Sequence, residues 1–207
     1  MPRAFSEEER NEIHRRLLEA GRANFVRYGI RRTKIEDLTH AAGISKGAFY
    51  AFFDSKEALF MDVLEAYEQE QREQIFSIAL SPEKPARANL AALLREAFGT
   101  LESNAFLDNF DRQDFAVLLR SLPQERIEAH LQGDQAFVQQ ILERWERSPE
   151  LIARDPRIVE GLMKALFFVN LHKADFDAAD YRAALDVLID LVAGYIVGEL
   201  ESRHDNR

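Results

Sequence analysis

Cysteine is absent from the 207 residues of this chain, which excludes disulfide bonds, thiolate zinc sites and a cysteine nucleophile. Long hydrophobic runs are missing as well. The uncharged apolar run Leu191–Gly198 spans only eight residues, whereas a membrane-spanning helix needs about 20. The first twelve residues carry three consecutive glutamates and no apolar segment. We therefore expect no signal peptide, no membrane partner and a cytoplasmic protein.

Proline and glycine are scarce, at six and nine residues, and the alternation of β-branched residues that is typical of strands does not occur. Apolar residues instead recur at intervals of three and four, the period of an amphipathic helix. Hydrophobic residues make up 46% of the chain, which is enough to build a core. The pattern predicts an all-α protein of about nine helices.

Positive charge is also in deficit, since 27 Lys and Arg against 36 Asp and Glu give a net charge of −9. This balance argues against a protein coated with nucleic acid. The charge is uneven, however, because residues 1–60 hold 11 basic and 9 acidic residues and the remainder hold 16 and 27. A basic head on an acidic body suggests two functions, although two ordinary solvated surfaces would account for the difference almost as well.

Capping signals predict four helices in the first 78 residues. Capping boxes are expected at Ser6–Glu9 and Thr33–Glu36, and single caps at Ser45 and at Asp54 or Ser55. The helices that follow these caps are expected to end at Gly29, at Ala42, at residue 52 and near residue 78. Further helices are expected at about 87–101, 105–120, 124–147, 156–173 and 178–201.

The segment Thr33–Leu59 has the pattern of a helix-turn-helix, in which two short helices cross steeply around a tight turn. Gly43 supplies the permissive backbone that such a turn needs. The residues expected to point inward from both helices are apolar, namely Leu38, Ala42, Ile44, Phe49 and Phe52. A plain three-helix packing unit explains these offsets less well, because several independent positions agree.

The outward face of the second short helix suits DNA. Ser45 and Lys46 lie at a helix N-terminus, where backbone N–H groups favour phosphate. Small residues follow, so the helix can enter a major groove deeply, and Tyr50 can reach a phosphate oxygen. Thr33 and Lys56 lie at two other predicted helix starts, where they can also bind the DNA backbone. The predicted DNA-binding residues are Thr33, Ser45, Lys46, Gly47, Ala48, Tyr50 and Lys56.

The run Gly43–Leu59, GISKGAFYAFFDSKEAL, resembles the N-terminal domain of the TetR/AcrR family of transcriptional regulators, which typically reads A-G-[VI]-S-x-G-x-x-Y-x-[HY]-F-x-x-K-x-x-L. The resemblance covers residues 7 to about 66. It implies DNA-facing positions for the seven residues above, and a homodimer. In one departure, Ala51-Phe52 stands where the family often has a polar or aromatic pair with His second, so Phe52 is expected in the core.

The chain is expected to consist of a helix-turn-helix DNA-binding domain over residues 1–55 and a helical effector-binding and dimerisation domain over 56–207, joined by a long helix. Helices at about 156–173 and 178–201 are expected to form a four-helix bundle with a second copy. The predicted interface residues are Leu185, Leu188, Val192, Gly194, Tyr195 and Gly198. Alternatively, Gly198 only loosens the end of its helix.

Aromatic residues at helical spacing within residues 87–147 form either plain core or the walls of a ligand pocket. The candidate ligand-binding residues are Phe98, Phe106, Phe110, Arg120, His130, Trp145, Asn170 and His172. No cofactor and no metal is predicted.

The leading hypothesis is a repressor that a small-molecule effector releases from a palindromic double-stranded DNA operator. The first alternative is a DNA-binding architectural or division-control protein without a small ligand. The second is an enzyme on a helical bundle. Because His-Glu-x-x-His, Walker loops and the paired Glu-x-x-His motifs of a di-metal site are absent, no enzymatic activity is predicted.

Overall fold

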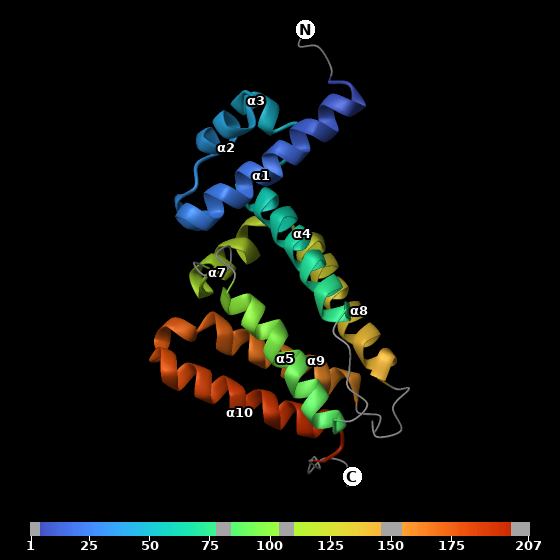
Figure 1. The fold of residues 1–207 in the computed structure, drawn as a ribbon. Coiled ribbons are helices and arrows are strands. Elements are labelled where there is room, and N and C mark those ends of the chain that lie inside the picture. Colours follow the sequence, from blue (N-terminus) through green and yellow to red (C-terminus); the bar gives the residue numbers. More distant parts are fainter. Residues whose placement is uncertain (1–4, 78–83, 104–109, 146–154, 200–207) are drawn as a thin grey trace. The chain divides into compact units, whose positions relative to one another are not determined.

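A computed structural model of the chain describes residues 5–77, 84–103, 110–145 and 155–199 (Figure 1). Within these ranges all regular secondary structure is helical, which confirms the predicted all-α class. The helices are α1 (Glu7–Arg32), α2 (Ile35–Ala42), α3 (Lys46–Phe49), α4 (Lys56–Ser77), α5 (Ala86–Ser103), α7 (Arg112–Ser121), α8 (Gln124–Trp145), α9 (Pro156–Leu171), the 3-10 helix η1 (Lys173–Asp175) and α10 (Ala178–Ile196). None of the described helices combines the length and the apolar character that crossing a membrane requires.

The chain divides into two compact units. The first consists of Met1–Glu70 and Glu102–Ile127, and the second of Gln71–Leu101 and Glu128–Arg207. Helices α4, α5 and α8 each begin in one unit and end in the other. These boundaries reflect compactness, so the functional boundary between residues 55 and 56 stays a prediction.

Helix α1 begins at the predicted capping box. The Ser6 hydroxyl accepts a hydrogen bond from the Glu9 N–H at 3.1 Å, and the Glu9 carboxylate accepts one from the Ser6 N–H at 2.8 Å. Near its other end the helix is interrupted at Gly29, whose φ of 70° and ψ of 168° are not helical. The predicted stop at Gly29 is therefore a kink, and one further turn follows it to Arg32.

The turn between α2 and α3 depends on Gly43, which ends α2 in the left-handed conformation at φ 67° and ψ 36°. The N–H of the next residue, Ile44, then donates to the Thr39 carbonyl at 3.0 Å. Ser45 caps α3, because its hydroxyl accepts a hydrogen bond from the Ala48 N–H at 3.1 Å. The predicted tight turn and the Ser45 cap are both confirmed.

Two local predictions in this region are wrong. The expected capping box at Thr33 does not form, because α2 has Lys34 at its N-cap without a side-chain hydrogen bond, and the Thr33 hydroxyl donates to the Gly29 carbonyl at 2.8 Å. Helix α3 has four residues instead of seven, and residues 50–52 form turns. Of the two cap candidates for α4, Ser55 caps the helix, accepting from the Ala58 N–H at 3.1 Å.

Aromatic and aliphatic side chains from α1 to α4 form the core of the first unit. Phe49 from α3 and Leu38 from α2 are completely buried among residues of α1 and α4 such as Leu17 and Leu59. Phe52 is only partly buried: it packs against this core, and its ring also lies under the Arg10 guanidinium at 5.1 Å. Burial of these residues fixes α2 and α3 against α1.

In the second unit, α5, α9 and α10 share a separate apolar core. One polar group lies inside it, where the Tyr181 hydroxyl donates to the Asn170 side chain at 2.9 Å. At the surface, Arg95 of α5 pairs with Asp186 at 2.6 Å and with Asp190 at 2.9 Å on α10. Asp155 caps α9 with Pro156 in its first turn, the position predicted for that proline.

We expect Gly43→Ala to lower the free energy of unfolding by about 1 kcal/mol, because a Cβ atom is strained in the left-handed conformation. Space is not the cause, since the nearest atom to that Cβ would be the Arg16 Nη1 atom at 3.4 Å. Urea denaturation measures the change. Gly43→Asn is the matched control and should cost less, because Asn tolerates this conformation better. An equal loss for both variants would show that side-chain bulk, and not backbone strain, decides.

Candidate nucleic-acid interface

Helix α3 presents opposite faces to the core and to solvent. Phe49 is completely buried, whereas the next residue, Tyr50, is 49% exposed. Lys46 and Gly47 are exposed and Ala48 is half-buried. Because only small or polar side chains stand on the outer face, another surface can approach the backbone of α3 closely. This exposure is what the predicted DNA-facing residues of α3 require.

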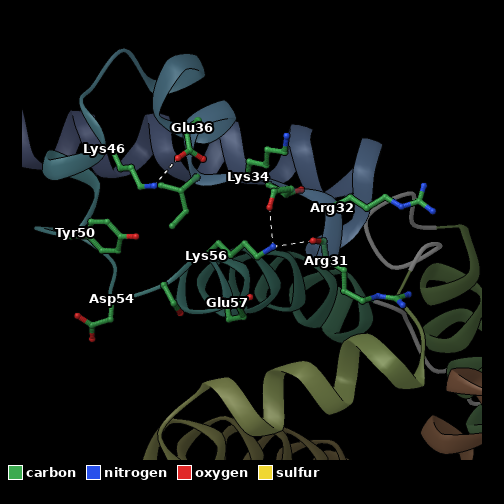
Figure 2. A pocket seen from close by; sticks show the side chains of 12 residues that line it. Arg31, Arg32, Lys34, Glu36, Lys46, Tyr50, Asp54, Lys56 and Glu57 are labelled. Atoms are coloured by element: carbon green, nitrogen blue, oxygen red, sulfur yellow. Dashed lines mark hydrogen bonds and ion pairs between the residues drawn. The ribbon is translucent and has the colours of Figure 1, made fainter.

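An open hollow of about 680 Å³ lies beside this face (Figure 2). Its lining comes from the starts of α2, α3 and α4 and from the end of α1. The lining residues are Arg31, Arg32, Thr33, Lys34, Ile35, Glu36, Lys46, Tyr50, Asp54, Ser55, Lys56 and Glu57. Five of these side chains are cationic and three are anionic, so the hollow carries an excess of positive charge. A polyanion is the ligand that such a surface favours.

Lys46 is paired within the hollow. Its Nζ atom lies 2.6 Å from a carboxylate oxygen of Glu36, and both side chains are more than half exposed. The hydrogen bond between them lowers the pKa of Glu36 and raises the pKa of Lys46. In the free protein this lysine is therefore held against α2.

Thr33 and Lys56 do not present their polar groups as the sequence suggested. Thr33 is only 1% exposed, so its hydroxyl, bonded to Gly29, does not face a ligand, and the predicted contact from that side chain is corrected. Lys56 donates from Nζ to the carbonyls of Thr33 at 2.8 Å and Arg31 at 3.1 Å (Figure 2). Its ammonium group therefore ties the start of α4 to the link between α1 and α2.

Arg31 connects this link to α7. Its guanidinium donates to Asp114 at 2.7 Å and to Asp111 at 2.9 Å, and it also bonds Gln113. Burial raises the pKa of Asp114, while the hydrogen bonds from the Asp111 N–H and from Arg31 act in the opposite direction. A buried carboxylate with a partner is costly to separate from it, so the contact fixes the end of α1 against α7.

Arg32 and Lys34 were not among the predicted DNA-binding residues, yet both are exposed and line the hollow. The signal was present in the sequence as the basic run Arg31–Lys34 just before α2. Such a run indicates a binding surface only when the fold places it beside α3. These two side chains are exposed cations at the α1–α2 edge of the hollow.

The residues Gly43 to Gly47 also match the Gly-x-Ser-x-Gly spacing of serine hydrolases. In those enzymes the serine lies on a turn from a strand to a helix. Here Ser45 lies between two helices, and its hydroxyl accepts the capping hydrogen bond of α3. The spacing therefore belongs to the helix-turn-helix.

The described members of the predicted ligand-binding set are divided between the two units. Phe110 belongs to the first unit, where its ring stacks on Phe60 at 5.5 Å, whereas Phe98 is buried in the core of the second. Phe106 and the side chain of Trp145 lie outside the described residues. The polar candidates have protein partners: Arg120 with the Ala116 carbonyl, His130 with Asp134, Asn170 with Tyr181 and His172 with Asp175.

The predicted interface residues of α10 need correction as well. Leu185, Val192 and Gly194 are buried in the core of their own unit, so they are not available to a second copy. Leu188 and Tyr195 are half-buried. Gly198 lies beyond the end of α10 with φ 80°, so it is not part of the interface helix in which the sequence placed it.

Comparison with known proteins relates the N-terminal helices of the chain to transcriptional regulators. The family model of the bacterial regulatory proteins of the tetR family matches residues 17–63. The chain is 27% identical to the HTH-type transcriptional regulator YerO of Bacillus subtilis over 89% of its length. That match spans 66% of YerO, just under two thirds, and matches to three further curated relatives span half of their lengths or less.

Solved structures show the same fold. A TetR-family transcriptional regulator from Pectobacterium atrosepticum is similar with a TM-score of 0.67 at 20% identity, over 96% of this chain and 99% of that one. The regulator FadR from Bacillus subtilis, solved in complex with stearoyl-CoA, is similar with a TM-score of 0.58 at 16% identity, over 91% and 100%. The matching family and the relatives named above are transcriptional regulators.

We expect Lys56→Met to lower the free energy of unfolding by about 1 kcal/mol, because it removes two charge-assisted hydrogen bonds to backbone carbonyls. Lys34→Met is the matched control: it removes an exposed lysine from the same hollow and should leave stability unchanged within about 0.5 kcal/mol. Thermal and urea unfolding of both variants measure the difference. Equal stability of the two variants would mean that the Lys56 hydrogen bonds contribute nothing to the fold.

Proposed function

Since the chain belongs to the TetR family of DNA-binding transcriptional regulators, we propose that it acts as a homodimeric repressor that a small-molecule effector releases from a palindromic operator. The observation that carries the proposal is the outer face of α3. Its exposed N-terminal residues adjoin a hollow with an excess of cationic side chains, although the chain as a whole carries a net charge of −9.

In the proposed complex, α3 enters the major groove. Gly47 and Ala48 allow the backbone to approach base edges, and the methyl group of Ala48 suits contact with a thymine methyl. Lys46, Tyr50, Arg32 and Lys34 stand around this face, where they can bind phosphates on both sides of the groove. Ser45 contributes its position at the N-terminus of α3. Thr33 and Lys56 support the same face from within.

A homodimer is supported by exposed apolar side chains on the second unit. On α9, Ile158 and Phe168 are 38% and 48% exposed, and on α10, Val187 and Leu191 are 58% and 48% exposed. The spacing of four residues places Val187 and Leu191 on one face of α10. Helices α9 and α10 pack on each other (Figure 1), so two copies can bury these faces together as a four-helix bundle. Two copies of α3 would then meet successive major grooves.

The effector response is supported by chain connectivity. Helix α4 begins beside the hollow at Lys56 and continues to Ser77 in the second unit. A ligand that binds one arrangement of α4 more tightly would shift the spacing of the two α3 helices in the dimer. That FadR was solved with stearoyl-CoA suggests an effector with a long apolar chain for this protein, which has 15 phenylalanines.

We expect Lys46→Ala combined with Tyr50→Ala to weaken operator binding at least about tenfold, because both contacts at the edge of α3 are lost. The duplex is one that the wild-type protein selects from a random library, and binding is measured by fluorescence anisotropy. The control combines Tyr28→Ala with Lys84→Ala, which removes an exposed tyrosine and an exposed lysine outside the hollow. Unchanged affinity of the α3 variant would contradict the proposed interface.

We expect Val187→Asp combined with Leu191→Asp to convert the dimer to monomers at micromolar concentration, because two buried carboxylates per subunit would face each other. Sedimentation equilibrium measures the mass. Leu131→Asp is the control: Leu131 is 39% exposed on α8, outside the proposed interface, and its variant should remain dimeric. A dimer that survives both changes on α10 would place the interface elsewhere.

A further inference from the structure

Glu36 is an acidic residue on the surface that the proposed function assigns to DNA. It lies in the first turn of α2 and lines the same hollow as Tyr50 and Lys34. A carboxylate at such a place repels phosphate, so its presence needs a reason. The reason suggested by the sequence, a capping box with Thr33, does not hold, because the Thr33 hydroxyl bonds to Gly29 and α2 has no side-chain cap.

The carboxylate of Glu36 instead forms an ion pair with a lysine of α3. It lies 2.6 Å from Nζ of Lys46, which is the single basic residue of α3 (Figure 2). Both side chains are exposed, at 61% and 55%, so solvent and a ligand can reach either partner. The pair joins α2 to α3 across ten residues of sequence and holds the lysine on the side of the hollow.

We propose that Glu36 is an internal competitor for DNA phosphate, which occupies Lys46 in the free protein and so lowers its affinity for duplex DNA. The inference rests on the proposed function, since it concerns the same surface. An ammonium group paired with a carboxylate must exchange it for a phosphate on binding. Breaking the ion pair costs free energy, and this cost weakens the binding of Lys46 to phosphate. Because phosphate is present in every duplex, the effect does not depend on the DNA sequence.

The surroundings of the pair support the exchange. The hydrogen bond between Glu36 and Lys46 lowers the pKa of the carboxyl and raises the pKa of the ammonium, so both groups remain charged. Once Lys46 turns to a phosphate, Glu36 retains Lys34 as a neighbouring positive charge, which already lowers its pKa. The other acids of the hollow, Asp54 and Glu57, lie at the start of α4. Of these three carboxylates, Glu36 is the one that forms an ion pair with the lysine of α3.

A regulator benefits from weaker binding to phosphate because the genome contains a large excess of non-operator DNA. Sequence-independent attraction to phosphate holds the protein on these competing sites. A carboxylate that reduces this attraction leaves the contacts of Gly47 and Ala48 with base edges untouched. The acid therefore limits the time spent on non-operator DNA without altering the surface that reads the sequence.

The test uses the full chain and a mixed-sequence duplex of about 30 base pairs, long enough for both halves of a dimer. Fluorescence anisotropy at several salt concentrations gives the affinity. We expect Glu36→Gln to bind about three to ten times more tightly than the wild type at low salt, because the competitor is gone. Asp37→Asn is the matched control: it removes the same charge from the same turn of α2, where no ion pair to Lys46 exists, and should change affinity less than about twofold.

A double-mutant cycle with Lys46→Gln separates the exchange from a general effect of charge. In the Lys46→Gln background the gain from Glu36→Gln should fall to the level of Asp37→Asn. Equal gains for Glu36→Gln and Asp37→Asn, or a gain that persists without Lys46, would overturn the inference while wild-type binding upholds the proposed function. A wild-type protein that binds no duplex even at low salt would overturn the proposed function, and the inference with it.

Discussion

Burial of Phe49 is the interaction on which the proposed DNA-facing surface depends. Helix α3 has only four residues, too few to be stable by itself, so packing must determine its place and its rotation. Phe49 is completely buried and its ring lies 5.9 Å from that of Phe53. At about 100° per residue, Gly47 then lies on the side of α3 opposite Phe49. The bare outer face is thus a consequence of where one aromatic ring is buried.

The link between α1 and α2 is the second point at which the surface is held. The carbonyl of Arg31 accepts from Lys56 of α4, while the guanidinium of the same residue donates to Asp111, the N-cap of α7, and to Asp114 within that helix. A single residue therefore joins two helices to the start of α2. Movement of α4 or α7 cannot leave the basic run Arg31–Lys34 where it is without breaking these bonds. The same bonds would carry a movement of α4 or α7 to the side chains for which phosphate binding is proposed.

The sequence predicted those features that depend on a few neighbouring residues. The Ser6–Glu9 box, the left-handed Gly43 and the Ser45 cap are local, and the apolar offsets around Gly43 identified the helix-turn-helix. The failures involve a choice between partners. Thr33 bonds to Gly29 because the kink brings that carbonyl within reach, and Leu185 faces its own core instead of a second copy. Helical periodicity predicts which residues form an apolar stripe on a helix. It does not predict whether the same chain or a second copy covers that stripe.

Sequence counts of charged residues likewise do not show which charges are paired in the fold. The excess of basic residues in the first 60 positions overstates the positive charge offered to DNA, because several of these residues already have acidic partners: Arg15 pairs with Glu12, Arg31 with Asp114 and Lys46 with Glu36. Arg32 and Lys34 are exposed and form no ion pair within the described part of the chain. An acidic protein can therefore bind a polyanion through a small surface, provided that a few cations stay accessible and the remaining ones exchange partners on contact.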